Sequence, residues 1–351
     1  MLLGLVNGLD TNKYDITVQT LFGVGKYINE LNPNIHFKYL FRKQFRGLPF
    51  FLKFFPAKLL YYLFIRDKYD VEIAYLETAP TRIIGGSKTD GTKKIAWVHT
   101  TMQSPPKSYR SINELIQCYH NFDKIVFLST LAQNAFYKLT NNDNWPSAIV
   151  RNVIDSNEIL HLSKEIVELP TDGKIRLMHL GRLVEVKGAV RLLQILHELK
   201  KKGCDQWHLY YLGTGLQQGE IEKYIQNNNL QNDVTLLGFQ HNPYKFLAKM
   251  DLLVCASLVE GYSTAAVEAT ILEVPTLTTK CSGMEEIFAD GKYGLIVDNN
   301  DIAIEQGLKR VLTNPSILEC YKSKLPERKS YFAYNTLLKE NEDFIDSVIN
   351  L

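Results

Sequence analysis

Residues 251–298 read DLLVCASLVEGYSTAAVEATILEVPTLTTKCSGMEEIFADGKYGLIVD and predict a strand, a loop, a helix, a second strand and a turn. The apolar run 252–257 predicts a buried strand, and the helical pattern that follows begins near Ser263. Glu260 then lies at the carboxyl end of the strand, and Glu268 lies on the helix. Because open parallel sheets bind ligands beyond the carboxyl ends of their strands, this stretch predicts a ligand site.

The same alternation of strands and helices runs along both halves of the chain. In the second half the predicted strands are Ile175–Leu180, Trp207–Leu212, Val234–Leu237, Asp251–Ala256, Thr276–Thr279 and Leu295–Val297. In the first half they are Asp15–Leu21, 34–41, Val71–Tyr75, Lys94–Val98, Lys124–Leu128 and Ser147–Val150. This pattern predicts two α/β domains with parallel sheets. The polar segment Arg151–Lys174 predicts a linker, and a final amphipathic helix is expected over 335–349.

Composition places the chain among soluble globular proteins, with 45% hydrophobic and 22% charged residues over 351 positions. Residues 1–150 hold 18 Lys and Arg against 11 Asp and Glu, a net charge of +7, so this half favours an anionic surface. The five cysteines form no CxxC pair, which argues against a disulfide framework or a zinc site and favours a reducing cytosol. No secretory signal and no apolar run long enough to span a bilayer is expected.

The beginning of the chain is unusual for a doubly wound domain. Residues 1–22 predict the end of a helix, a turn and a strand, without the opening strand and glycine-rich turn that normally come first. In the usual strand order that opening strand is central, so we expect a domain that lacks a central strand. A truncated gene model and a sheet that compensates for the loss remain as explanations.

The stretch Lys38–Lys68 is basic and aromatic. It contains eight Lys and Arg and a single acid, Asp67, with Phe, Tyr and Leu interleaved. One interpretation is a surface that binds anionic membrane lipid, with aromatic rings at the interface. The other is a helix pair whose aromatic face packs on the sheet. Nucleic-acid binding is a weaker third option because no recognition motif accompanies the stretch.

Two loops of the second half carry candidate phosphate-binding residues. Arg182 and Lys187 lie between a strand and a helix, where they would hold a diphosphate or serve only as surface cations. Gly213-Thr214-Gly215 follows the next strand. It is an incomplete dinucleotide motif without a ribose-binding acid, so NAD binding is not expected. A tight turn beside a ligand is expected instead.

The acidic and imidazole side chains suit sugar recognition. Glu268 on its helix can accept two hydrogen bonds from a diol, and Glu260 can accept one from a sugar hydroxyl. The backbone between them, at a helix N-terminus, can bind a phosphate. Alternatively, each acid has a surface or capping role. His99, directly after the strand IAWV, is positioned to bond a sugar hydroxyl or to cap the strand end. No metal site is indicated.

Five segments together resemble the C-terminal domain of retaining glycosyltransferases of family 4, also called group 1. They are GRLVEVKG, YLGTG, VTLLGF, SLVEGYSTAAVEA and SGMEEIFADGKYGLIV, within residues 150–313, with a looser likeness at WVHTT. The resemblance implies the GT-B architecture, with two facing Rossmann-like domains and a nucleotide-sugar in the cleft. The N-terminal domain departs from it by the missing first strand and glycine loop. The implied boundaries are 1–155, 156–334 and a returning helix at 335–351.

The resemblance also implies the roles of the site residues. Arg182 and Lys187 would bind the diphosphate, Glu260 the donor sugar and Glu268 the ribose, while His99 would lie near the reacting sugar. The remaining donor-binding positions are Gly213, Gly215, Phe239, Gly261, Tyr262, Ser263 and Thr264. Neither a cofactor nor a metal is expected for the chemistry.

The expected activity is transfer of a hexose, with retention, from a UDP-sugar or GDP-sugar to the hydroxyl of a glycan or lipid-linked glycan. We expect a role in cell-surface polysaccharide synthesis, in the cytoplasm and at the inner face of the membrane. One alternative is a non-catalytic remnant, because of the missing strand. Another is a sugar phosphorylase of the same architecture.

Overall fold

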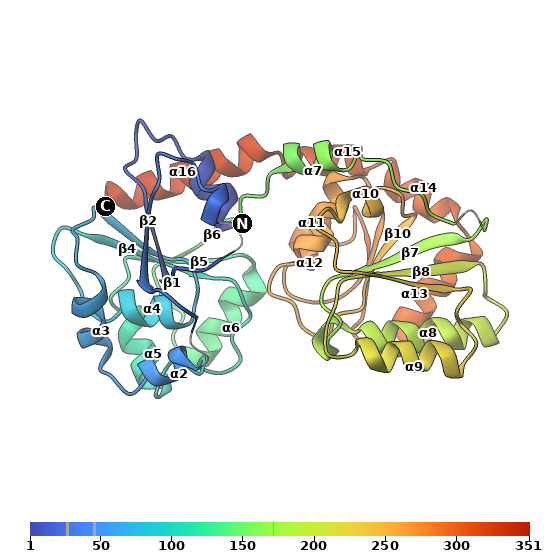
Figure 1. Cartoon of the computed structure of the whole chain (residues 1–351), viewed down its shortest axis with the longest axis horizontal. Coiled ribbons are helices and arrows are strands. Elements are labelled where there is room, and N and C mark those ends of the chain that lie inside the picture. Colours follow the sequence, from blue (N-terminus) through green and yellow to red (C-terminus); the bar gives the residue numbers. More distant parts are fainter. Residues whose placement is uncertain (26–27, 45–46, 171) are drawn as a thin grey trace. The chain divides into compact units, whose positions relative to one another are not determined.

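Short buried strands alternate with helices throughout the computed structural model, as the apolar runs of the sequence predict (Figure 1). The structure describes residues 1–25, 28–44, 47–170 and 172–351. Phe45 and Arg46 of the basic stretch and Thr171 of the predicted linker therefore lie outside the described residues. The chain divides into one unit of residues 1–154 and 334–351 and another of residues 155–333.

The C-terminal unit contains one parallel sheet of six strands in the order β12-β11-β10-β7-β8-β9. Its strands are β7 (Ile175–Leu180), β8 (Trp207–Leu212), β9 (Val234–Gly238), β10 (Leu252–Cys255), β11 (Thr276–Thr279) and β12 (Leu295–Val297). Most positions of β8, β10 and β11 are buried, since helices cover both faces of the sheet.

The helices of this unit form two layers. Those on one face are α8 (Ala189–Lys201), α9 (Gln218–Asn227) and α13 (Asp301–Thr313), preceded by the 3₁₀ turn Glu185–Lys187. The others are α7 (Ser156–Leu162), α10 (Tyr244–Leu247), α11 (Thr264–Ile271), α12 (Met284–Phe288), α14 (Ser316–Lys322) and α15 (Leu325–Tyr331). The core between α8, α9, α13 and the sheet contains Leu192, Leu196, Trp207 and Leu308, each fully buried.

The predicted linker is wrong in part, because α7 occupies Ser156–Leu162 within it. The Asp155 side chain caps this helix by accepting from the backbone N–H groups of Asn157 and Glu158. Asp155 and Glu158 are spaced as in a capping box, a signal that the polar composition of the segment obscured.

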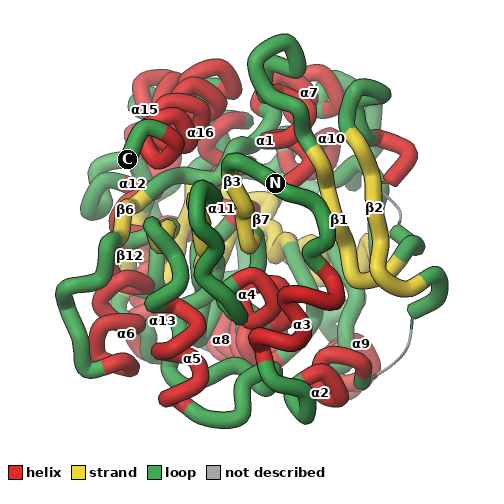
Figure 2. The backbone as a smooth tube through the Cα atoms, turned by 90° about the vertical axis from the view of Figure 1, so that its left-hand side faces the viewer, coloured by secondary structure: helices red, strands yellow, loops and turns green. Residues whose placement is uncertain are grey.

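The N-terminal unit contains two separate parallel sheets. Among the described residues, β1 (Thr17–Phe22) pairs only with β2 (His36–Phe41), and Figure 2 shows these two strands side by side. The second sheet has the order β3-β4-β5-β6. Its strands are β3 (Val71–Ala74), β4 (Lys93–Val98), β5 (Lys124–Phe127) and β6 (Ser147–Ile149). Doubly wound domains usually have one strand between those that β1 and β3 represent. The N-terminal sheet is therefore interrupted at the position where the sequence predicts a missing central strand.

Helices pack on both faces of these two sheets. They are α1 (Leu2–Gly8), α2 (Leu48–Leu52), α3 (Ala57–Phe64), α4 (Ala79–Ile84), α5 (Ile112–Tyr119), α6 (Thr130–Thr140) and α16 (Tyr334–Ile349), with a 3₁₀ turn at Ile28–Glu30. Val6 of α1 packs against Val18 of β1. Asn341 of α16 donates to the backbone carbonyl of Arg151 at 2.9 Å, so the last helix belongs to this unit. None of the helices within the described ranges is long and apolar enough to cross a bilayer.

Candidate functional site

The predicted site residues of the C-terminal unit gather at the carboxyl edge of its sheet. β7 and β10 are neighbours in the sheet, yet the chain continues from β7 toward β8 and from β10 toward β11, in opposite directions. Such a reversal is where open parallel sheets bind their ligands. Arg182 and Lys187 follow β7, and Glu260 follows β10.

Lys187 and Glu260 form an ion pair at this point. The Lys187 Nζ lies 2.7 Å from both carboxylate oxygens of Glu260, and the Ser257 hydroxyl donates to Glu260 Oε1 at 2.6 Å. The Glu260 side chain is 7% exposed and the Lys187 side chain 26%. The pair therefore holds a buried carboxylate beside a cation that still reaches the surface.

The loop that carries Glu260 is held by its backbone carbonyls. The Thr279 hydroxyl donates to the carbonyl of Ser257 at 2.7 Å, and the Asn299 amide donates to the carbonyl of Leu258 at 2.9 Å. Arg191 in turn donates to Asn299 Oδ1 at 2.7 Å. These groups come from β11, from the turn after β12 and from α8, so the loop is fixed from three elements.

The 3₁₀ turn is joined to the same loop. The backbone N–H of Leu258 donates to the carbonyl of Val186 at 2.9 Å. Gly188 has φ +67°, and a Cβ there would lie 2.1 Å from the carbonyl oxygen of Ala256. Only glycine allows this close approach, so the 3₁₀ turn and the Glu260 loop are held in a fixed relation.

The exposed guanidinium of Arg182 lies on the β7 loop, and no ion pair to it is found within the described part of the chain. Gly213 and Gly215 pack against this loop. A Cβ on Gly213 would lie 2.0 Å from the carbonyl oxygen of Gly181, and one on Gly215 would lie 2.2 Å from that of Leu183. These glycines thus permit close backbone packing. Phe239, after β9, is 61% exposed at the same edge.

Glu260 is followed by Gly261 and Tyr262, which lead into α11. Ser263 caps this helix by accepting from the backbone N–H of Ala266, and Thr264 is its first residue. Glu268 lies one turn further along. Burial raises the pKa of its carboxyl to about 7, an effect that the Tyr244 hydroxyl opposes.

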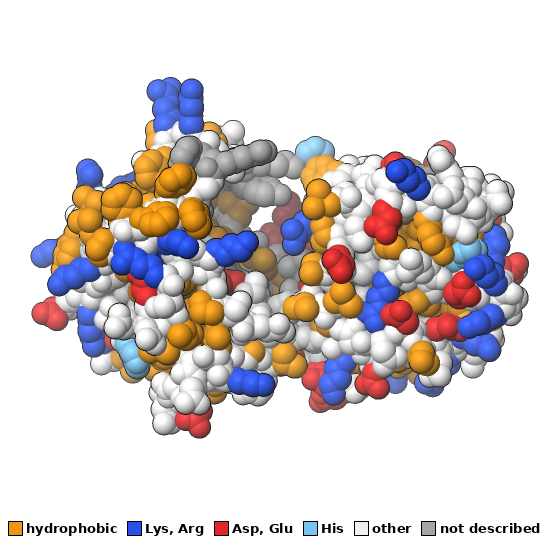
Figure 3. All heavy atoms as spheres, turned by 90° about the horizontal axis from the view of Figure 1, so that it is seen from below, with side chains coloured by type: hydrophobic (Ala, Val, Ile, Leu, Met, Phe, Trp, Pro, Cys, Tyr) orange, Lys and Arg blue, Asp and Glu red, His pale blue; other side chains and the backbone are white. Residues whose placement is uncertain are grey.

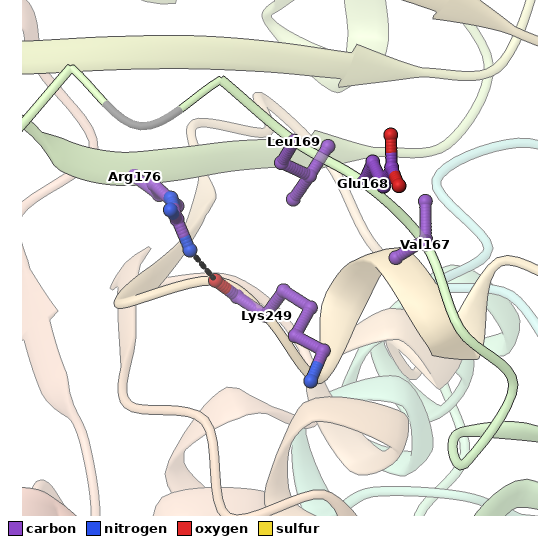
Figure 4. A pocket seen from close by; sticks show the side chains of 5 residues that line it. All are labelled: Val167, Glu168, Leu169, Arg176 and Lys249. Carbon is purple, nitrogen blue, oxygen red and sulfur yellow. Dashed lines mark hydrogen bonds between the residues drawn. The ribbon is translucent and has the colours of Figure 1, made fainter.

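A hollow of about 410 Å³ lies elsewhere in this unit (Figure 4). It is lined by Val167, Glu168, Leu169, Arg176 and Lys249. Arg176 is near the start of β7 and Lys249 precedes β10, so the hollow is at the amino ends of these strands. Parallel sheets bind their ligands at the opposite edge. Within the described ranges, no three His, Cys, Asp or Glu side chains gather as a metal ion would require.

Comparison with known protein families identifies the family of the domain that contains this sheet edge. Residues 163–336 match the family described as Glycosyl transferases group 1. The domain that these residues form belongs to the glycosyl transferases group 1 family. This confirms the resemblance found in the sequence.

Two of the curated relatives have names that refer to bacterial glycans. The N-acetylgalactosamine-N,N'-diacetylbacillosaminyl-diphospho-undecaprenol 4-alpha-N-acetylgalactosaminyltransferase of Campylobacter jejuni is 32% identical over 186 residues, 52% of this chain and 49% of that protein. The capsular polysaccharide biosynthesis glycosyltransferase CapM of Staphylococcus aureus is 27% identical over 178 residues, 47% of each chain. The chain thus spans about half the length of these two relatives.

Solved structures extend the likeness to both units. Anabaena HepE in complex with UDP and glucose has a TM-score of 0.75 and 17% identity, over 99% of this chain and 95% of that one. The sucrose-phosphate synthase of Thermosynechococcus elongatus has a TM-score of 0.76 and 15% identity, over 99% and 92%. At these identities the comparison concerns the fold alone, and it confirms the predicted GT-B fold of this chain.

His99 belongs to the N-terminal unit and lies at the carboxyl end of β4. Its backbone N–H donates to Glu77 Oε2 at 3.2 Å, and the Thr100 hydroxyl donates to Glu77 Oε1 at 2.7 Å. Its ring lies 4.8 Å from that of Tyr75. Burial lowers the pKa of His99, although the Glu77 carboxylate opposes this, so the imidazole is neutral near pH 7.

The structure brings Lys187 and Glu260 into contact and places Arg182, Gly213, Gly215 and Phe239 on adjoining loops of one sheet edge. It also adds residues that the sequence analysis did not identify. Glu77, Thr279 and Asn299 act through contacts that are distant along the chain, so the sequence does not indicate their partners. Ser257 bonds Glu260 three positions further on. The strand-end location of Thr279 and Asn299 is the signal that points toward the site.

Proposed function

We propose that this chain transfers a hexose from a nucleotide-diphosphate sugar to an acceptor hydroxyl, with retention of configuration at the transferred carbon. The observation that carries the proposal is the Lys187–Glu260 pair at the strand-order reversal of a group 1 domain. A cation beside a carboxylate at that edge suits a ligand with both a diphosphate and a sugar.

The two cations of the β7 loop would serve the diphosphate. The exposed Arg182 guanidinium is free to meet phosphate oxygens two at a time, whereas Lys187 acts as a point charge. As the bond between sugar and diphosphate breaks, negative charge grows on the diphosphate. Fixed cations stabilise that charge more in the transition state than in the bound donor, which lowers the barrier.

Glu260 would recognise the sugar. Its carboxylate already accepts from Lys187 and Ser257 and is almost fully buried. When a diphosphate takes up part of the Lys187 charge, a Glu260 oxygen becomes a stronger acceptor for a sugar hydroxyl. Binding of the two ends of the donor is thereby coupled through one ion pair.

The segment directly after Glu260 would hold the remainder of the nucleotide. The backbone N–H groups of Gly261, Tyr262, Ser263 and Thr264 precede and begin α11, where a helix N-terminus favours phosphate. Glu268, once ionised, accepts two hydrogen bonds from a ribose diol. Gly213, Gly215 and Phe239 would border the donor on the neighbouring loops.

His99 would hydrogen-bond the transferred sugar as a neutral imidazole. Its lowered pKa supports this role, because a neutral ring offers both a donor and an acceptor. The Glu77 carboxylate would act on His99 by fixing the turn that carries it.

The proposed reaction balances without a cofactor or a metal. The bond between the sugar's anomeric carbon and the diphosphate oxygen breaks, and a bond to the acceptor oxygen forms on the same face. The acceptor proton passes to a phosphate oxygen of the departing diphosphate. The nucleoside diphosphate therefore leaves with the electron pair and the proton.

We further propose a glycan on a lipid carrier as the acceptor, in the synthesis of a cell-surface polysaccharide. The names of the Campylobacter and Staphylococcus relatives, which refer to a diphospho-undecaprenol-linked glycan and to capsular polysaccharide, support this choice. The location that follows is the cytoplasm, at the inner face of the cell membrane.

A panel of UDP- and GDP-hexoses tests the proposal. The correct donor at 100 times its dissociation constant should stabilise the fold by about 2.7 kcal/mol in a thermal unfolding assay. That donor should then release nucleoside diphosphate when acceptor is added. NMR of the product should show the donor's anomeric configuration. Inversion, or release of sugar phosphate that depends on added inorganic phosphate, would contradict the proposal.

A second candidate is a protein that binds a nucleotide-sugar without transferring it. The interruption of the N-terminal sheet between β1 and β3 favours this candidate. Donor binding by calorimetry, without nucleotide release in the presence of acceptor, would identify it.

A further inference from the structure

Helices α2 and α3 and the turn between them expose an unusual set of large apolar side chains. Phe50, Phe51, Phe54, Phe55, Leu59, Tyr62 and Leu63 are each 44–62% exposed, and together they are named the aromatic platform. The Phe50 ring lies 5.5 Å from that of Phe54 and 6.3 Å from that of Phe51. Isolated exposed apolar residues are ordinary, but a gathered set marks a binding surface.

The platform accounts for both interpretations of the basic and aromatic stretch. Leu60 and Tyr61 of α3 are buried against the fold, as the packing interpretation expects. Leu59, Tyr62 and Leu63 are spaced three and four apart on the same helix and point outward. One helix thus has an inner apolar face that packs and an outer apolar face that is uncovered.

Two arginines hold the backbone beneath the platform. The Arg82 side chain, 1% exposed, donates to the carbonyls of Leu52 at 2.9 Å and Phe55 at 2.7 Å. Arg110 donates to the carbonyls of Lys53 at 2.6 Å and Phe54 at 2.9 Å. Four successive carbonyls are therefore turned inward onto guanidinium groups.

Glu114 completes this support. Its Oε1 accepts from Arg82 at 2.6 Å, and its Oε2 accepts from the backbone N–H of Arg110 at 2.7 Å. The charge of the buried Arg82 is thus balanced. Because the backbone is fixed in this way, the phenyl rings are held outward before any partner arrives, which reduces the conformational entropy lost on binding.

The surroundings of the platform are cationic. Lys53 lies over the Phe50 ring at 4.4 Å, and Lys58, Arg66 and Lys68 are exposed. The sole acid of the stretch, Asp67, is paired with Lys38 at 2.5 Å. Figure 3 shows apolar side chains mixed with Lys and Arg over this unit. Such a surface complements an anionic partner that also accepts aromatic rings.

We propose that the aromatic platform docks this chain onto an anionic lipid bilayer. The rings enter the boundary between headgroups and acyl chains, and the surrounding lysines and arginines contact lipid phosphates. The proposal rests on the proposed function in one respect, that a lipid-linked acceptor gives the docking its purpose. It identifies the residues that bind the membrane and the buried arginine that orients them.

Vesicle co-sedimentation without donor or acceptor tests the proposal. The chain should partition at least about tenfold more into vesicles of phosphatidylcholine with phosphatidylglycerol than into phosphatidylcholine alone, and less at high salt. The double variant Phe51→Ser, Phe54→Ser should lose at least about tenfold of that binding. The control Ile166→Ser, Ile302→Ser removes side chains that are 92% and 69% exposed in the other unit and should bind like the parent chain.

Circular dichroism melting of each variant establishes that it is folded, and Lys53→Gln with Lys58→Gln provides a second variant with the rings intact. Equal partition into both kinds of vesicle, or full binding by the folded Phe variant, would overturn the docking proposal. Donor binding by calorimetry separates the two proposals. Vesicle binding without any donor binding would contradict the proposed function alone, and donor binding without vesicle binding would contradict the docking alone.

Discussion

The Lys187 ammonium lies 2.7 Å from both carboxylate oxygens of Glu260, although 73 positions separate the two residues along the chain. One follows β7 and the other follows β10, so the contact exists only because these strands are neighbours in the sheet. A candidate cation for phosphate and a candidate carboxylate for sugar are thus one electrostatic unit.

The stability losses from removing the two partners of this pair should not be additive. Lys187→Ala leaves the buried Glu260 carboxylate without its cation, and we expect a loss of about 1–3 kcal/mol in the free energy of unfolding. The double variant with Glu260→Gln should lose less than the sum of the two single losses. Urea unfolding of the four proteins measures the coupling, and additive losses would show that the pair contributes nothing.

Glu268 should make the stability depend on pH. Its pKa is raised from 4.5 to about 7 in the folded protein, so between these values the unfolded chain has released a proton that the folded protein keeps. The free energy of unfolding should therefore fall as pH rises through this window and stay lower above it. Relative to pH 4, Glu268→Gln should retain about 1–3 kcal/mol more stability at pH 8. Parallel pH profiles of the two proteins would refute the assignment.

Asn299 should matter for activity more than for stability. Its amide holds the carbonyl of Leu258 at 2.9 Å, two residues before Glu260. We expect Asn299→Ala to lower kcat/KM for the donor by at least about tenfold, through misplacement of the carboxylate. Asn228→Ala is the matched control, because Asn228 donates to the carbonyl of Tyr224 at 2.8 Å on a distant helix. Equal activities of the two variants would remove Asn299 from the account.

The interrupted N-terminal sheet should appear in amide exchange. In the part of the chain that the structure describes, β1 and β3 are each paired on one side only, whereas β4 and β5 are paired on both. Peptides covering Thr17–Phe22 and Val71–Ala74 should therefore exchange faster than those covering Lys93–Val98 and Lys124–Phe127. Equal protection in hydrogen–deuterium exchange would mean that β1 and β3 are less open than their pairing indicates.

Much of the C-terminal unit could be predicted, because its strands are continuous apolar runs that end in glycine or in a polar loop. The predicted limits of Ile175–Leu180 and Trp207–Leu212 agree with the structure to the residue. Local signals suffice there, since the inner strands β8, β10 and β11 are buried on both faces. The helix Ser156–Leu162 was missed because a single capping signal lay within a polar segment.

The site could be predicted in composition but not in its contacts. Arg182, Lys187 and Glu260 were identified from strand-end positions, yet nothing local indicates that Lys187 pairs with Glu260. Glu77 and Asn299 form hydrogen bonds with residues that lie 22 and 41 positions away in the sequence. Only the folded structure reveals these contacts. The outward face of α3 was equally hidden, because an apolar helical residue is expected to be buried.

The rate of donor turnover in Lys187→Ala, measured beside that in Lys201→Ala, tests whether the Lys187 charge stabilises the departing diphosphate. Lys201 pairs with Glu198 at 2.7 Å on the exposed surface of α8, so its variant removes the same charge and a similar ion pair from a distant place. We expect Lys187→Ala to lose at least about 100-fold of the transfer rate with the saturating donor, while Lys201→Ala stays within about twofold of the parent chain. A folded Lys187→Ala protein that turns over donor at the parent rate would contradict it.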